Sequence, residues 1–182
     1  MIQFCEDRPP INKLVTIGTP HAGVSMTPYC GDYWFCLLLD WTINRIAYYS
    51  IVQKYLAPAN YWRDPQNPQG FLDKSSFLAI ANNEVEDKNS TYRDRMVAIN
   101  EVLLIKNSKD SVVIPRASAH FAKFDGLYNE IALEDQDLWT EDWLGLRELY
   151  ERGDLHYHTS DTTHAIYTEE EMTDLIVPFL QE

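Results

Sequence analysis

Residues 102–115 read VLLIKNSKDSVVIP, and this stretch carries the clearest structural signal in the chain. Its first four residues form a short apolar run, which is typical of a strand buried on both faces of a parallel sheet. Asp110 follows just beyond that run, and a second apolar run then ends at Pro115. The pattern therefore predicts a buried strand that delivers a carboxylate to the end of a sheet.

A second buried strand is predicted nearer the N-terminus, over residues 13–18 (KLVTIG), because prolines and a glycine bound it on both sides. From Trp34 to Leu56 the apolar and aromatic residues recur at three- and four-residue spacing, which predicts a helix. Residues 57–72 contain three prolines and a glycine and predict a loop. Shorter helices are expected near residues 75–82 and 90–98.

The last third of the chain predicts a helix, a strand and a second helix. The first helix is expected from Thr140 to a glycine stop at Gly153, and the strand at residues 155–158. Thr168 and Glu171 form the capping box of the final helix. Strands separated by helices predict an α/β fold with a parallel sheet. Three strands are few for such a sheet, so we expect part of it to lie outside this chain.

The composition excludes several classes of function. Among 182 residues, 15 are Lys or Arg and 28 are Asp or Glu, so the formal net charge is −13. Such an acidic protein repels phosphate backbones, and no nucleic-acid partner is expected. No apolar run approaches the roughly 18–20 residues of a membrane span, and from its first residues no signal peptide is expected. The three cysteines, at positions 5, 30 and 36, do not settle the redox compartment.

Three polar corners follow the predicted strands. Residues 18–23 (GTPHAG) form a T-P-H-x-G corner of the kind found in many α/β-hydrolase lipases and esterases, although glycine and proline punctuate any strand end. Asp110 stands where that fold presents its triad acid, the alternative being a solvated turn aspartate. His164 stands in the polar loop after the last strand, where the triad histidine usually lies, the alternative being a lone surface histidine.

The order of these residues supports the catalytic interpretation. In α/β-hydrolases the triad runs Ser, then Asp or Glu, then His, so Asp110 and His164 would be its second and third members. The imidazole takes a proton from the serine hydroxyl, and the carboxylate sets its tautomer. No G-x-S-x-G motif occurs, and Ser25, the nearest approach, lacks the second glycine. The nucleophile is therefore expected upstream of the first strand, outside this chain.

A metal site is the competing interpretation of the same region. His156 and His158 would share one face of a strand, and with His164 and Asp154 or Asp161 they could hold a metal ion. Asp161 also competes with Asp110 for the role of triad acid, because it lies only three residues before His164.

The whole chain resembles the C-terminal part of the lysosomal palmitoyl-protein thioesterases. The segments that carry the likeness are residues 9–12 (PPIN), 20–24 (PHAGV), 61–65 (YWRDP), 89–92 (NSTY), 109–113 (KDSVV), 144–146 (LGL), 153–155 (GDL) and 176–180 (IVPFL). The resemblance implies a partial α/β-hydrolase fold, in which residues 1–182 form the C-terminal part of one domain with a helical lid insertion at about 30–98.

The resemblance also implies a function. Family members remove thioester-linked fatty acyl groups from protein cysteines through an acyl-serine, so S-palmitoylated proteins or acyl thioesters are the expected substrates. No cofactor or metal is expected. By position, the triad acid falls on Asp110 and the triad histidine on His164. The serine and the oxyanion donors have no counterpart, so the chain alone is expected to be inactive. A generic lipase or esterase, or a non-catalytic truncated isoform, remains the alternative.

Further sites are implied by position in the family. The acyl groove is expected to use Trp34, Leu37, Leu38 and Trp41, although dense apolar helices usually fill a core. Cys30 and Cys36 are expected to form a disulfide, which leaves Cys5 over. Asn89 begins the sequon Asn-Ser-Thr and is the expected glycosylation site. The implied location is lysosomal or secreted.

Overall fold

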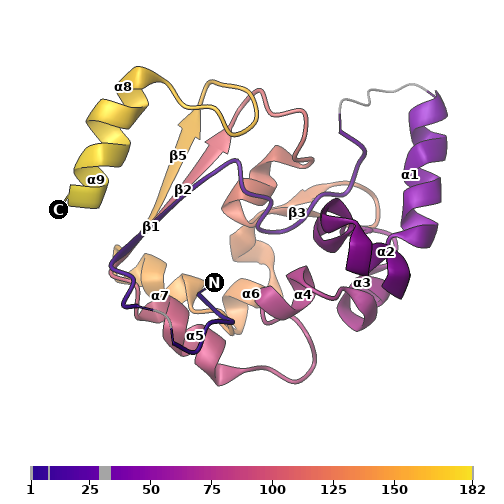
Figure 1. Ribbon diagram of the computed structural model, residues 1–182, viewed down its shortest axis with the longest axis horizontal. Coiled ribbons are helices and arrows are strands. Elements are labelled where there is room, and N and C mark those ends of the chain that lie inside the picture. The colour runs from indigo at the N-terminus through magenta and orange to yellow at the C-terminus, as the bar shows by residue number, and fades with distance from the viewer. Residues whose placement is uncertain (1, 8, 29–33, 182) are drawn as a thin grey trace.

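The computed structural model describes residues 2–7, 9–28 and 34–181, except for the side chains of residues 34–37. Its centre is a parallel sheet of three described strands in the order β1-β2-β5, which run side by side in Figure 1. The strands are β1 (Lys13–Ile17), β2 (Glu101–Asn107) and β5 (Leu155–Ser160). Val15 lies opposite Leu103, and Leu104 lies opposite Tyr157. The predicted α/β class with a parallel sheet is confirmed.

The remaining elements fall into three groups along the chain. Between β1 and β2 lie α1 (Trp34–Ile46), α2 (Ser50–Tyr55), η1 (Ala57–Tyr61), α3 (Pro68–Lys74), α4 (Leu78–Ala81) and α5 (Ser90–Val97). Between β2 and β5 lie η2 (Arg116–His120), β3 (Lys123–Phe124), β4 (Glu130–Ile131), η3 (Leu133–Asp135), α6 (Asp137–Thr140) and α7 (Leu146–Glu151). After β5 come α8 (Glu169–Glu171), η4 (Met172–Ile176) and α9 (Val177–Gln181). β3 and β4 pair antiparallel, away from the main sheet.

Strand β2 is buried on both faces because side chains alternate across a strand. Val102 and Leu104 join the cluster built by α5 and α7, whereas Leu103 and Ile105 pack on Ile176 of the C-terminal helix. Figure 1 shows that C-terminal helix on one side of the sheet, with α5 and α7 on the other. The helices that follow β1 surround a separate apolar cluster, which includes Tyr48, Trp62, Phe71 and Leu78.

The helix predicted from Trp34 to Leu56 is broken into α1 and α2, so that prediction was wrong in its continuity. Polar contacts of buried side chains explain the break. The amide of Gln53 donates to the carbonyl of Ala47 at 2.6 Å, and the hydroxyl of Tyr48 accepts the N–H of Asp64 at 2.9 Å. Tertiary partners therefore hold the chain in a turn between the two helices.

Two other boundaries were also predicted wrongly. Part of the expected loop at 57–72 is helical, because Asn67 caps α3 by accepting the N–H of Gly70, and Pro68 suits a first helical position. Thr140 ends α6 instead of starting the next helix, which begins at Leu146. The capping box of Thr168 and Glu171 is confirmed. None of the described helices combines the length and apolar character that crossing a bilayer requires.

Candidate active site

Three loops leave the carboxyl ends of the parallel strands and meet at one edge of the sheet. The N–H of Gly18 donates to the carbonyl of Ile105 at 2.9 Å, which joins the first loop to β2. The N–H of Lys109 donates to the carbonyl of Thr162 at 3.0 Å, which joins the second loop to the third. Parallel α/β sheets bind their ligands at this edge, because all the strands point their carboxyl ends toward it.

Asp110 and His164 come together across two of these loops, as the sequence predicted. Oδ2 of Asp110 lies 2.8 Å from Nδ1 of His164. Oδ1 accepts the backbone N–H groups of Val112 and Val113 at 2.7 and 3.0 Å, and the residue is only 2% exposed. An ionised carboxylate only accepts hydrogen bonds, so the contact assigns the ring proton to Nδ1 and leaves Nε2 as the basic nitrogen.

Asn107, which sequence reasoning did not single out, holds the loop that carries His164. Its amide nitrogen donates to Oγ1 of Thr162 and to the carbonyl of Ile166, both at 2.7 Å. Its oxygen accepts the N–H of Ala165, a residue with a positive φ of 54°. A buried amide at the end of an apolar strand was the one signal that could have pointed to it.

Gly18 is required for the same arrangement. Its φ is +58°, and a Cβ there would lie 2.6 Å from Oδ1 of Asn107 and 3.0 Å from the backbone nitrogen of Ala165. Glycine therefore allows the first loop to approach the histidine loop closely.

The competing acid and metal ligands do not gather around His164. Asp161 accepts from Nζ of Lys109 at 2.8 Å and from Oγ of Ser108 at 2.8 Å, and it is exposed. His156 faces Glu101 at 3.3 Å, and His158 faces Glu171 at 3.0 Å. His156 and His158 thus lie beside two different carboxylates. Within the described part of the chain, His, Cys, Asp and Glu side chains form no group of three that could hold a metal.

An apolar cavity of about 380 Å³ opens beside His164. Its wall comes from the corner after β1, from residues within 43–62, from the loop after Asp110 and from the loop that carries His164. The residues that represent these segments are Val24, Ile43, Ala47, Val52, Val113 and His164. The volume lies within the range of about 300–1,000 Å³ that is common for small-molecule sites, and the lining suits a hydrocarbon.

The residues predicted for an acyl groove lie elsewhere or are not described. Leu38 and Trp41 are exposed, and neither lines this cavity. The side chains of Trp34 and Leu37 lie outside the described part of the structure, and so do Cys30 and the side chain of Cys36. The α1 residues that do line this cavity are Ile43 and Ile46, which come later along the helix than the four predicted positions.

Two other predicted residues are described. Asn89 is exposed and caps α5, and its Oδ1 accepts the N–H of Thr91 at 3.0 Å. Ser25 is buried, and its N–H donates to the carbonyl of Ile114 at 2.8 Å. Among the described residues, no hydrogen bond joins the Ser25 hydroxyl to His164.

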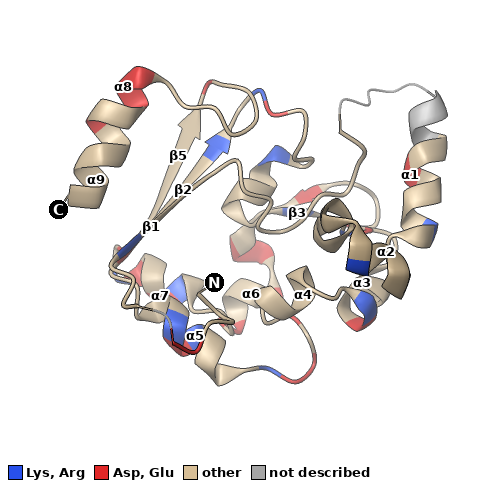
Figure 2. Ribbon diagram, viewed as in Figure 1, with Lys and Arg blue, Asp and Glu red and all other residues tan. Residues whose placement is uncertain are grey.

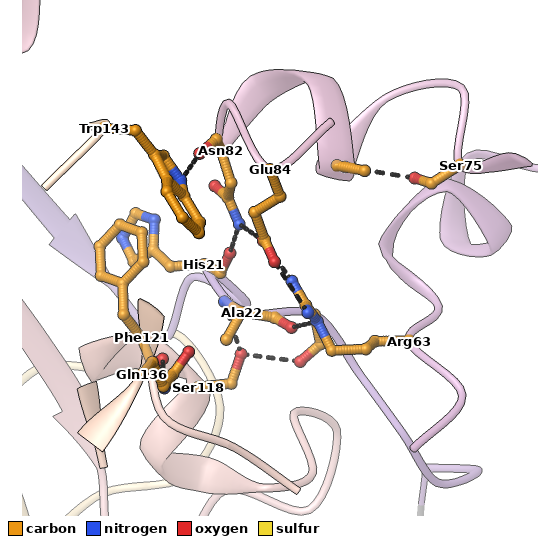
Figure 3. Close-up of polar contacts among 12 residues, drawn as sticks. His21, Ala22, Arg63, Ser75, Asn82, Glu84, Ser118, Phe121, Gln136 and Trp143 are labelled. Carbon is orange, nitrogen blue, oxygen red and sulfur yellow. Dashed lines mark hydrogen bonds and ion pairs between the residues drawn. The ribbon is translucent and has the colours of Figure 1, made fainter. Parts of the chain in front are cut away.

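A buried ion pair holds the corner that follows β1 (Figure 3). Nη1 of Arg63 donates to Oε2 of Glu84 at 3.0 Å, Nη2 donates to Oε1, and Nε donates to the carbonyl of Ala22 at 2.6 Å. The amide of Asn82 donates to the carbonyl of His21 at 2.8 Å and to Glu84 at 3.0 Å. Burial acts to raise the pKa of Glu84, but the charge and hydrogen bonds of Arg63 outweigh it, and the pKa is lowered.

His21 of this corner points into a second cavity, of about 320 Å³, and not into the one beside His164. Its ring stacks on Phe121 with centroids 4.5 Å apart, as Figure 3 shows, and Nε2 lies 2.9 Å from Oγ1 of Thr16. Burial, together with the charge of His120, lowers the pKa of His21 to about 4. The imidazole is therefore neutral at pH 7, and its role in the corner is one of packing.

Comparison with known proteins points in one direction. A family model described as palmitoyl protein thioesterase matches residues 1–164. The chain is 32% identical to palmitoyl-protein thioesterase 3 of Dictyostelium discoideum, over an alignment covering 96% of this chain and 62% of that protein. It is 36% identical to palmitoyl-protein thioesterase 1 of Caenorhabditis elegans, over 86% of this chain and 53% of that protein.

A third relative is the lysosomal thioesterase PPT2 homolog of Drosophila melanogaster, which is 33% identical over 93% of this chain and 60% of its own length. The chain therefore spans a little more than half the length of each of these three relatives. The matched region includes both Asp110 and His164. On this match and the parallel α/β sheet, the chain belongs to the palmitoyl protein thioesterase family, whose members are thioester hydrolases.

Proposed function

We propose that this chain supplies the acid–base half of a serine hydrolase that removes thioester-linked fatty acyl groups from protein cysteines. The observation that carries the proposal is the 2.8 Å contact between Oδ2 of Asp110 and Nδ1 of His164, beside an apolar cavity of about 380 Å³. His164 is the general base that takes a hydroxyl proton on Nε2 and later returns it to the leaving thiol. Asp110 orients the ring and stabilises the imidazolium that forms.

The apolar cavity is proposed to receive the acyl chain. A saturated chain gains roughly 0.8 kcal/mol for each CH₂ that it buries, so a long acyl group is bound mainly by such a wall. Val112 and Val113 link the cavity to the acid, because their N–H groups bind the Asp110 carboxylate while their side chains line the wall. A thioester carbonyl attached to the buried chain would then lie next to His164.

The nucleophilic serine is proposed to lie outside residues 1–182, together with the oxyanion donors. Support comes from the missing G-x-S-x-G motif, from the burial of Ser25, and from the share of the relatives' length that this chain covers. An imidazole and a carboxylate alone form no acyl-enzyme. In this proposal residues 1–182 are the C-terminal part of one α/β-hydrolase domain, and residues from about 30 to 98 are its lid insertion.

The first experiment measures hydrolysis of a palmitoylated peptide thioester by purified residues 1–182. We expect no turnover above the uncatalysed rate and no labelling by a fluorophosphonate probe. Turnover accompanied by stoichiometric labelling of a serine in this chain would overturn the proposed division of the site.

The second experiment tests the acid–base pair without requiring turnover. The proton on Nδ1 of His164, held by a buried carboxylate, should give a slowly exchanging downfield NMR signal. Asp110→Asn should remove that signal, whereas Asp161→Asn, which alters an exposed carboxylate, should leave it in place. Survival of the signal in Asp110→Asn would contradict the assignment.

The third experiment tests the cavity. Val52→Trp fills it and should weaken binding of a fluorescent hexadecanoate analogue by about tenfold or more, because several CH₂ groups lose their contacts. Val177→Trp, on the C-terminal helix, is the matched control and should bind as the wild type does. Equal affinities for all three proteins would place the acyl chain elsewhere.

The remaining proposals concern the cellular setting. Relatives named lysosomal thioesterases support a lysosomal location for the whole protein, and a secreted one is equally compatible with glycosylation. The exposed Asn89 is proposed as the glycan site, and Cys30 with Cys36 as a disulfide. Intact mass after expression in a eukaryotic secretory host, before and after glycosidase and reductant, tests both. Free thiols at positions 30 and 36 would refute the disulfide.

A further inference from the structure

The surface of α1 and α2 exposes more large apolar side chains than the other helices do. We call it the α1–α2 surface, and six of its residues are each more than half exposed: Leu38, Trp41, Tyr49, Ile51, Tyr55 and Leu56. Single exposed apolar residues are ordinary in soluble proteins, but six of them within residues 38–56, in two adjacent helices and the residues that flank α2, are not. Such a group leaves apolar area in water unless something covers it.

This surface borders the mouth of the cavity beside His164. Leu56 and Ile46 both line the cavity and are exposed to solvent, so they form its rim. Ile51 and Tyr55 belong to the helix that ends at this rim. Exposed apolar residues of α2 are therefore close in the chain to residues that line the cavity.

The charge of the α1–α2 surface is opposite in sign to that of the whole protein. Between residues 38 and 56 the charged residues are Arg45, Lys54 and Asp40. Asp40 is buried and accepts the N–H of Thr27 at 2.7 Å, so only the two cations face solvent. Elsewhere the chain has enough acidic residues to give a net charge of −13. In Figure 2, α1 and α2 are mostly tan, with few charged segments.

Each of the two cations lies over an aromatic ring. The guanidinium carbon of Arg45 is 4.1 Å from the ring centroid of Trp41, and Nζ of Lys54 is 5.4 Å from that of Tyr55. Exposed aromatics and aliphatics with cations beside them characterise helices that lie in a lipid–water interface. The apolar parts enter the acyl region, while the cations meet the anionic headgroups.

We propose that the α1–α2 surface docks on an anionic lipid bilayer and so presents the cavity mouth to acyl chains held in the membrane. A second copy of this chain is a poorer occupant, because the surface offers no exposed carboxylate to pair with Arg45 and Lys54 of the other copy. This inference goes beyond the proposed hydrolase function. Docking on lipid requires neither a nucleophile nor turnover, so its failure and the failure of the proposed chemistry are distinguishable.

The test is co-sedimentation of residues 1–182 with vesicles, in the absence of any thioester. We expect binding to vesicles of phosphatidylcholine with phosphatidylserine, and weaker binding to phosphatidylcholine alone. The double substitution Arg45→Gln with Lys54→Gln should weaken binding to the anionic vesicles by about 25-fold, from about fivefold for each cation. It should have little effect on the neutral vesicles.

A second pair of variants distinguishes binding through this surface from nonspecific hydrophobic binding to the vesicles. Ile51→Ser with Tyr55→Ser should weaken binding to both kinds of vesicle by about tenfold or more. Tyr150→Ser with Leu180→Ser is the matched control, because it removes one tyrosine and one aliphatic side chain, both half exposed, from α7 and α9. Far-UV circular dichroism checks that every variant is folded.

Fluorescence gives a readout independent of affinity. Brominated lipid should quench the wild type more than Trp41→Phe if the α1–α2 surface enters the bilayer. Equal binding of the wild type to both vesicle types would overturn the proposal. So would an equal loss of binding in the Ile51→Ser, Tyr55→Ser pair and in the Tyr150→Ser, Leu180→Ser control pair. So would a dimer in sedimentation velocity that the Ile51→Ser, Tyr55→Ser pair abolishes, without vesicle binding by the wild type.

Discussion

The substitution Glu84→Gln should destabilise the protein far more than its modest chemical change suggests. Both side chains of the Arg63–Glu84 pair are only 8% exposed. Glutamine keeps the shape of the side chain but removes its charge, so the guanidinium of Arg63 would stay buried without a counterion. The ammonium of Lys123 also acts on this region, because Arg63 and Glu84 both influence its pKa. The variant would therefore leave two cations near one neutral amide.

The expected loss can be estimated from the burial of the pair. Removing one partner of a buried ion pair typically costs about 3–5 kcal/mol. For a chain of this size that loss corresponds to a fall of about 6–20 °C in melting temperature, or about 1–2 M in the urea midpoint. The double variant Arg63→Met with Glu84→Leu should lose less than Glu84→Gln alone, because no charge is then buried unpaired.

The assay is urea unfolding followed by circular dichroism, at pH 7 and at lower pH. Because the folded pKa of Glu84 lies below its ordinary 4.5, the ionised carboxylate stabilises the fold above that pH and loses this effect as pH falls through the folded pKa. The difference between wild type and Glu84→Gln should therefore be largest near neutral pH. Asp161→Asn, at the exposed Lys109–Asp161 pair, should be indistinguishable from wild type. If Glu84→Gln behaved like Asp161→Asn, the reasoning would be refuted.

Three further predictions concern the loops at the sheet edge. Folding lowers the pKa of His21 from 6.5 to about 4, so the folded state is fully stabilised above pH 6.5 and should lose about 2 kcal/mol of unfolding free energy by pH 5. In urea unfolding, His21→Phe should lack this part of the pH dependence. An unfolding free energy that varies with pH in His21→Phe as it does in the wild type would contradict the prediction. Gly23→Ala should cost more than Gly153→Ala, although both glycines have positive φ, because a Cβ at Gly23 would lie 2.7 Å from the carbonyl oxygen of Tyr61 while nothing lies within 4 Å at Gly153. We expect about 1–2 kcal/mol at Gly153 and about 1–3 kcal/mol more at Gly23, and equal losses would refute the clash. Asn107→Ala should lower the free energy of unfolding by about 1–3 kcal/mol. It should speed hydrogen exchange at the N–H of Ala165, which donates to Asn107, but not at the N–H of Ser108, which donates to a backbone carbonyl. Equal acceleration at both N–H groups would contradict a specific role for Asn107.

Elements with a strong local signal were predicted well. The apolar runs at 13–17 and 102–105 are both strands. The second is buried on both faces, as its continuous apolar run predicts, whereas every residue of the first is only partly buried. The capping box at Thr168 forms because its two hydrogen bonds are local to one helical turn. Boundaries set by distant partners were predicted less well. The break after α1 depends on Gln53 and on Tyr48, whose hydroxyl binds the backbone at Asp64.

The sequence alone established the α/β class, the order of acid before histidine, and the family resemblance, because these depend on residue types and their spacing along the chain. It favoured Asp110 over Asp161 as the partner of His164, but only from its position after a predicted strand. That choice depends on the tertiary structure, in which parallel pairing of β2 and β5 brings residues 110 and 164 together, while Asp161 turns outward to Lys109. Nor could the sequence identify the cavity wall, because its residues come from four separate segments that meet only when the helices after β1 pack beside the loops that carry Asp110 and His164.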